Sequence, residues 1–126
     1  MDNRSLEIVS RFENSWKKTE YTLESLCENG FERLLPVRNF IVELKQKGEN
    51  QHFRIGTSLY RLIFSRSVDH GLRDDQKHIV IDTVNNYEYI ITFKDGLKAF
   101  RRYKINDLHD PKLTRLLATL KRTLVD

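Results

Sequence analysis

The sequence lacks the features that mark membrane, disulfide-rich and nucleotide-binding proteins. It contains a single cysteine, Cys27, which excludes an internal disulfide framework. No apolar run approaches the roughly 18 residues of a membrane-spanning helix, and the first residues do not resemble a signal peptide. A glycine-rich phosphate loop is also missing. We therefore expect a cytoplasmic, soluble protein that has no cofactor and no membrane contact.

Glycine and proline are few, at five and two residues, whereas aromatic residues make up 10% of the chain. This composition argues against disorder, because disordered chains have few aromatic residues and are rich in proline and charge. A chain of 126 residues can bury roughly two thirds of its unfolded surface without the help of a metal or a disulfide. We expect one α+β domain over residues 1–126.

The net charge of +4 is unevenly distributed. Residues 1–76 contain 12 Lys and Arg against 12 Asp and Glu, whereas residues 77–126 contain 10 against 6. The excess of four positive charges therefore lies in the C-terminal part, where it would attract an anionic partner and speed the encounter with it. Because this excess is small, a protein partner is favoured over nucleic acid.

The helical segment is expected within residues 1–48. Over residues 4–28 apolar side chains recur at helical spacing before the stop signal Asn29-Gly30. These apolar residues are Val9, Phe12, Trp16, Leu23 and Leu26. A second helix follows, with Pro36 at its start and Gly48 at its end. We expect the first helix to lie across a sheet, with Trp16 in the core.

A C-terminal helix is expected over residues 110–125. Asp110 can cap its start, and Pro111 fits the first helical position, where a missing N–H does no harm. Its apolar stripe consists of Leu113, Leu116, Leu117, Leu120 and Leu124. Its outer side carries Lys112, Arg115 and Arg122. The stripe predicts a helix that packs on the core.

The sheet is expected over residues 52–105. From Phe53 to Phe64 the composition turns aromatic and aliphatic, and the run from Leu59 to Phe64 predicts a strand that is entered through a bend or bulge at Gly56. Asp95-Gly96 and, more weakly, Asn85-Asn86 predict two-residue hairpin turns. Three further strands would then run near residues 77–84, 87–94 and 97–105. The predicted fold class is α+β, with an antiparallel β-sheet of about four strands in a meander, packed by two N-terminal helices and one C-terminal helix.

Two-residue turns fix which residues face each other across these strands. Ile91 would face Val80 on one side and Phe100 on the other. Tyr89 would face Asp82 and Arg102. In this register neither face of the sheet is cleanly polar. The predicted neighbours Tyr89 and Arg102 therefore have two interpretations: an ordinary cross-strand pair that stabilises the sheet, or part of a partly exposed binding surface.

The candidate binding surface combines aromatic and basic side chains of the C-terminal part. It consists of Tyr87, Tyr89, Arg102, Lys104, Arg115 and Arg122. Aromatic and basic residues together can stack on bases and contact phosphates, but the glycine and phenylalanine pattern of an RNA-binding sheet is missing. We therefore favour a protein partner, with nucleic acid as the weaker alternative.

A polar loop over residues 65–76 is the alternative candidate for a metal-binding or catalytic site. The loop contains the carboxylates and the imidazole of Asp69, His70, Asp74 and Asp75, and His78 follows it. Such groups bind divalent ions or act as acids and bases, yet their spacing matches no known ligand pattern, and turn formation explains the same residues. We predict a non-enzymatic binding or regulatory protein; an enzyme or a metal or small-molecule binder that uses residues 69–78 is the alternative.

Overall fold

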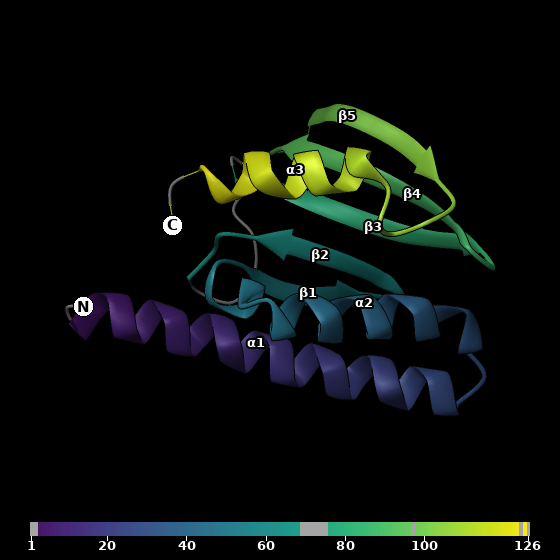
Figure 1. The fold of residues 1–126 in the computed structure, drawn as a ribbon, viewed down its shortest axis with the longest axis horizontal. Coiled ribbons are helices and arrows are strands. Elements are labelled where there is room, and N and C mark those ends of the chain that lie inside the picture. Colours follow the sequence, from purple (N-terminus) through teal and green to yellow (C-terminus); the bar gives the residue numbers. More distant parts are fainter. Residues whose placement is uncertain (1–2, 69–75, 97, 124, 126) are drawn as a thin grey trace.

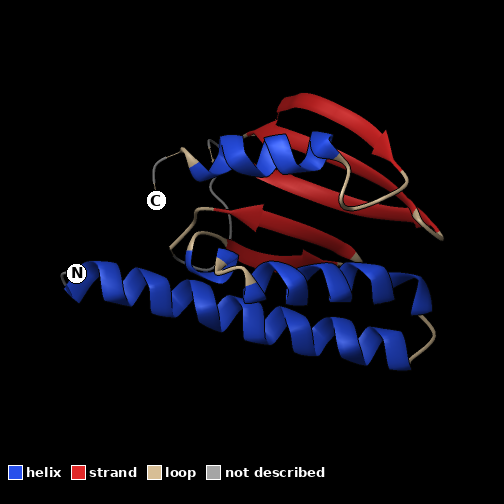
Figure 2. Cartoon of the chain, in the orientation of Figure 1, coloured by secondary structure: helices blue, strands red, loops and turns tan. Residues whose placement is uncertain are grey.

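Three helices flank an antiparallel sheet in the computed structural model (Figures 1 and 2), which describes residues 3–68, 76–96, 98–123 and 125. The helices are α1 (Asn3–Glu28), α2 (Leu35–Gln46) and α3 (Pro111–Lys121), with two short 3-10 helices, η1 (Glu32–Leu34) and η2 (Glu49–Gln51). The strands are β1 (Arg54–Ser58), β2 (Arg61–Ser65), β3 (Lys77–Asn85), β4 (Glu88–Asp95) and β5 (Lys98–Ile105). The predicted α+β class is confirmed.

The helices form where periodicity and capping predict them. The Asp110 side chain caps α3 by accepting a hydrogen bond from the backbone N–H of Lys112 at 2.9 Å. Trp16 is buried in the core, as expected, and so are Leu113, Leu116, Leu117 and Leu120 of the α3 stripe. Leu124 lies outside the described residues. Within the described part of the chain, no helix combines the length and the apolarity needed to cross a membrane.

The sheet has five strands among the described residues, in the order β1-β2-β3-β4-β5. The additional strand arises because the stretch predicted as one strand is a hairpin, in which Ser58 pairs with Arg61. Leu59 makes the turn with a φ of 57°. Turns usually place glycine or asparagine at a positive φ, so a leucine there gave no sequence signal.

The predicted register of β3, β4 and β5 is wrong. Tyr89 pairs with Thr83 and Ile105 rather than with Asp82 and Arg102. Ile91 pairs with Ile81 and Tyr103. The first turn lies at Asn86 and Tyr87, one residue later than predicted, and the register shifts between Thr83 and Asn85.

The second turn is also displaced, because Asp95 pairs with Lys98, and a further shift falls between Phe93 and Lys94. Each one-residue shift moves a strand's side chains to the opposite face of the sheet. The observed register places the buried residues Ile81, Tyr89 and Ile91 on one face, whereas Val80 and Ile90 lie half-buried on the opposite face.

This apolar inner face forms the core together with the helices. Burial alternates along β4, where Tyr89, Ile91 and Phe93 are buried and the residues between them are only half-buried. The leucines of α3 and Phe40 and Ile41 of α2 belong to the same buried cluster. The sheet therefore has an inner face under α2 and α3 and an opposite face, here called the outer face.

Helix α1 runs beside β1, at one end of the strand order (Figure 1). The Ser15 hydroxyl accepts a hydrogen bond from the backbone N–H of Ile55 at 3.0 Å, and the Trp16 indole N–H donates to the Phe53 carbonyl at 2.8 Å. Edge strands expose backbone groups that invite pairing with other chains. These two side chains occupy such groups at the β1 edge, so β5 is the remaining edge of the sheet.

Candidate functional site

The outer face of the sheet has an aliphatic centre. Ile63, Val80 and Thr92 are cross-strand neighbours, and Ile90 lies in the next row beside Asp82. All four of these uncharged side chains are half-buried. They occupy the strand positions that alternate with core residues, so they point away from α2 and α3.

Charged side chains border this centre, and positive charge dominates. Arg61 forms an ion pair with Asp82 at 3.5 Å, and Lys104 forms one with Glu88 at 3.7 Å. Lys94 and Arg102 lie on the same face, opposite His78 and Thr92 respectively. Among these described residues, four cationic groups therefore lie around two carboxylates on this face. An apolar centre with a polar border is the usual anatomy of a protein interface.

The structure separates the six residues of the predicted binding surface. Tyr89 is buried in the core with 1% of its surface exposed, beside Thr83 and Ile105 instead of Asp82 and Arg102, and burial raises the pKa of its hydroxyl. Tyr87 is exposed at the β3–β4 turn. Arg102 and Lys104 lie together on the outer face. Arg115 on α3 and Arg122 at its C-terminal cap are exposed, and α3 covers the inner face.

The predicted metal or catalytic loop lies mostly outside the described residues, which exclude Asp69, His70, Asp74 and Asp75. His78 is described and buried, and its Nδ1 lies 3.0 Å from the Gln76 carbonyl oxygen. Burial lowers the pKa of His78. The described residues contain no group of three or more His, Cys, Asp or Glu side chains that could hold a metal ion.

A cleft of about 390 Å³ lies between α2, the β3–β4 turn and the β5–α3 connection. His109 stands at this cleft, with its Nε2 2.8 Å from Glu43 Oε2 and its Nδ1 3.1 Å from Asp107 Oδ1. Hydrogen bonds to Glu43 and Asp107 raise the pKa of His109. A histidine held between two carboxylates is stabilised as a cation, and here it joins α2 to the β5–α3 connection.

Cys27 lies half-buried beside the core. Burial raises the pKa of its thiol, and the nearby Arg38 opposes this shift only in part. Because the thiolate is the nucleophilic form of cysteine, a raised pKa makes Cys27 a poor nucleophile.

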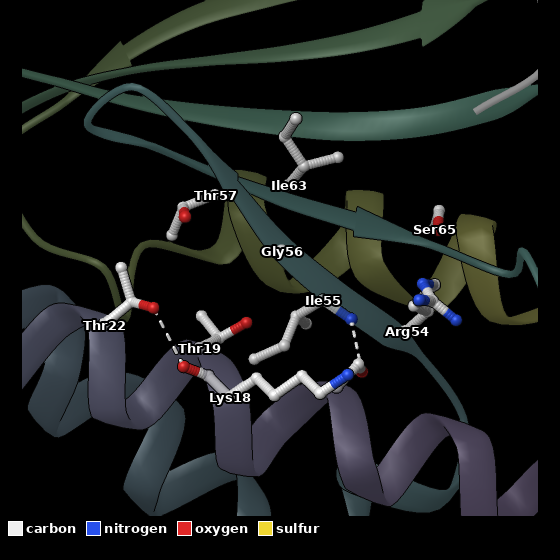
Figure 3. A pocket seen from close by; sticks show the side chains of 10 residues that line it. Lys18, Thr19, Thr22, Arg54, Ile55, Gly56, Thr57, Ile63 and Ser65 are labelled. Atoms are coloured by element: carbon white, nitrogen blue, oxygen red, sulfur yellow. Dashed lines mark hydrogen bonds between the residues drawn. The ribbon is translucent and has the colours of Figure 1, made fainter. Parts of the chain in front are cut away.

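A pocket of about 310 Å³ lies where the outer face meets α1 (Figure 3). Helix α1 contributes Ser15, Lys18, Thr19 and Thr22, and the strands contribute Arg54, Ile55, Gly56, Thr57, Ile63 and Ser65. This set, which we call the α1–β1 pocket, includes five hydroxyl groups and two cationic side chains. Its lining residues include no carboxylate or imidazole.

Sequence reasoning did not find the α1–β1 pocket. One signal was present, because Ser15, Thr19 and Thr22 recur at helical spacing and mark a hydroxyl-bearing stripe beside the apolar one. The contribution of β1 had no such signal, because the approach of α1 to β1 depends on contacts about 40 residues apart in the chain, such as Ser15 with Ile55.

Comparison of the chain with protein-family models, with curated proteins and with solved structures finds no match. The functional argument therefore depends on the residues of this chain and their geometry.

Proposed function

We propose that this chain is a non-enzymatic binding or regulatory protein that recognises an acidic protein partner through the outer face of its sheet. The cytoplasm is its expected compartment. The observation that carries the proposal is the half-buried aliphatic centre of the outer face, formed by Ile63, Val80 and Ile90 and bordered by charged side chains. Interfaces place apolar residues at the centre and polar residues at the rim.

The charge of the outer face supports an acidic partner. Lys94 and Arg102 form no ion pair within the described part of the chain, whereas Arg61 and Lys104 are paired with carboxylates. The uncompensated charge would attract a negatively charged surface and speed association. Aliphatic side chains at the centre favour protein over nucleic acid, since phosphate backbones are bound chiefly by basic and polar groups.

Charge reversal tests the proposal. Lys94→Glu combined with Arg102→Glu changes the net charge by the same amount as Arg115→Glu combined with Arg122→Glu, but on the opposite side of the molecule. In affinity purification from nuclease-treated native lysate, we expect the first variant to lose an acidic protein that the second retains. With the purified partner, we expect association to slow by about tenfold or more at low salt.

Two results would contradict this function. The first is loss of the partner with the α3 variant but not with the sheet variant. The second is tight, salt-sensitive binding of mixed DNA and RNA in fluorescence anisotropy at about 50 mM salt, where phosphate-driven binding is strong. The same charge-reversal variants would then define the nucleic-acid surface.

A further inference from the structure

The cleft beside His109 carries an inference that goes beyond the proposed protein partner. We propose that it binds a small organic ammonium ion, a primary amine attached to an apolar body. The ten residues that line the cleft include the carboxylates of Glu43 and Asp107 and the imidazole of His109, but no lysine or arginine. With His109 protonated, two negative charges against one positive charge give this lining a formal charge of −1. The lining therefore favours a cation, although the whole chain has a net charge of +4.

The charged groups of the cleft leave an acceptor free but no donor. Both ring nitrogens of His109 are used, since Nε2 lies 2.8 Å from Glu43 Oε2 and Nδ1 lies 3.1 Å from Asp107 Oδ1. Glu43 is also paired with Lys47 at 3.4 Å. The Oδ2 atom of Asp107 accepts no hydrogen bond from the described residues. An ammonium group therefore finds a free carboxylate oxygen in the cleft, whereas a phosphate or a carboxylate finds no free cation.

A buried hydroxyl group without a partner also faces the cleft. Tyr89 lines the cleft with only 1% of its surface exposed, and its hydroxyl forms no hydrogen bond with the described residues. In that part of the chain, the fully enclosed side-chain atoms without a partner belong to Arg38 and Arg66. The Tyr89 oxygen is therefore accessible from the cleft. A buried polar group without a partner costs free energy, which a ligand that hydrogen-bonds to it would recover.

Negative potential and apolar surface meet near this hydroxyl. Burial is the largest cause of the raised pKa of Tyr89, and the Tyr87 hydroxyl and the Asp107 carboxylate add to it, so both groups lie near the Tyr89 oxygen. Tyr87 is exposed beside the cleft, and its ring can receive a cation. Pro36 and Leu108 add apolar lining. The volume of about 390 Å³ lies within the range of about 300–1,000 Å³ for small-molecule sites. These features match an ammonium group on an apolar body.

Two substitutions probe the cleft, each with a matched control. Tyr89→Phe removes only the hydroxyl, and because this hydroxyl has no partner among the described residues, the substitution should not reduce stability. The half-buried Tyr103→Phe, outside the cleft, is its control. Asn106→Asp adds a negative charge to the lining, and the exposed Asn3→Asp adds the same charge away from it. None of these residues carries the charges assigned to the protein partner, so the two proposals fail independently.

Nuclear magnetic resonance of the ¹⁵N-labelled protein measures the binding at mildly acidic pH and constant ionic strength. We expect benzylamine to shift the backbone amides of Tyr87 and Asn106 saturably, with its neutral counterpart benzyl alcohol clearly weaker and its anionic counterpart benzoate without effect. Tyr89→Phe should weaken benzylamine binding by about tenfold, the loss typical of one hydrogen bond to a charged group. Asn106→Asp should tighten it by about fivefold, the effect of one unit charge about 4 Å away in water. Tyr103→Phe and Asn3→Asp should leave it unchanged.

N-acetyl-lysine methylamide, which carries the ammonium group of a lysine side chain, identifies the source of the cation. Weaker binding of this compound than of benzylamine supports a small free amine. Equal or tighter binding would assign the cation to a lysine of a protein and overturn the small-molecule assignment. Four results would overturn the site itself: no saturable shift, equal shifts with benzyl alcohol or benzoate, equal losses in Tyr89→Phe and Tyr103→Phe, or a loss of stability in Tyr89→Phe, which would show that the hydroxyl has a structural partner.

Discussion

At the scale of single residues, His109 is a titratable surface group that lies between two carboxylates. Glu43 reaches it from α2, and Asp107 reaches it from the β5–α3 connection. Phe40 packs edge-on against the imidazole, with ring centroids 5.8 Å apart. The hydrogen bonds from His109 also lower the pKa of Glu43 and Asp107. The three groups therefore form an ionic contact that fastens the start of α3 to α2.

This contact predicts a pH dependence. Because the pKa of His109 is raised, its stabilisation is fully present below the unfolded value of about 6.5 and is lost as pH rises through the folded value. The lowered pKa values of Glu43 and Asp107 have the opposite pH dependence. The stability that these two carboxylates contribute is lost only as pH falls through their folded pKa values. The contact is therefore strongest at mildly acidic pH.

We expect Glu43→Gln to lower the pKa of His109, measured by titration of its imidazole resonances, because the first cause of the raised pKa is the bond to Glu43. The loss of stability between about pH 6 and pH 8.5, on either side of the histidine range, should also become smaller. An unchanged His109 pKa would contradict the ion pair.

At the scale of elements, the helices were predictable and the strand pairing was not. Helix α1 and helix α3 carry their own information in apolar spacing and in caps such as Asp110 and Pro111. Strand pairing depends on the turns, and both Leu59 and Tyr87 adopt a positive φ without being glycine or asparagine. Register shifts also give no signal in sequence, so the two faces of the sheet could not be assigned correctly.

The contact of α1 with the edge of β1 leads to a second stability prediction. Ser15→Ala leaves the buried N–H of Ile55 without its acceptor, so we expect it to reduce the free energy of unfolding by about 1–3 kcal/mol. Ser10→Ala, at an exposed position of the same helix, is the matched control and should change it by less than about 0.5 kcal/mol. Urea unfolding measures both, and equal effects would show that Ser15 does not hold the edge strand.

At the scale of the whole molecule, the fold separates surfaces that the sequence placed together. The basic residues 101–104 and 112–122 are close along the chain, yet Arg102 and Lys104 lie on the outer face, whereas Arg115 lies on α3. The positive charge of the C-terminal part is thereby divided between opposite sides. Charge counting predicted an anionic partner but could not choose the surface, because that choice depends on strand register.

The outer face as the partner-binding surface is the central claim, and site-specific photo-cross-linking tests it most directly. A photoreactive amino acid at Thr92, in the middle of the outer face, is compared with one at the exposed Thr119 on α3. In nuclease-treated native lysate, we expect Thr92 to form a covalent adduct with an acidic protein, and Lys94→Glu with Arg102→Glu to abolish it. Adducts with that protein formed from Thr119 but not from Thr92 would contradict the account.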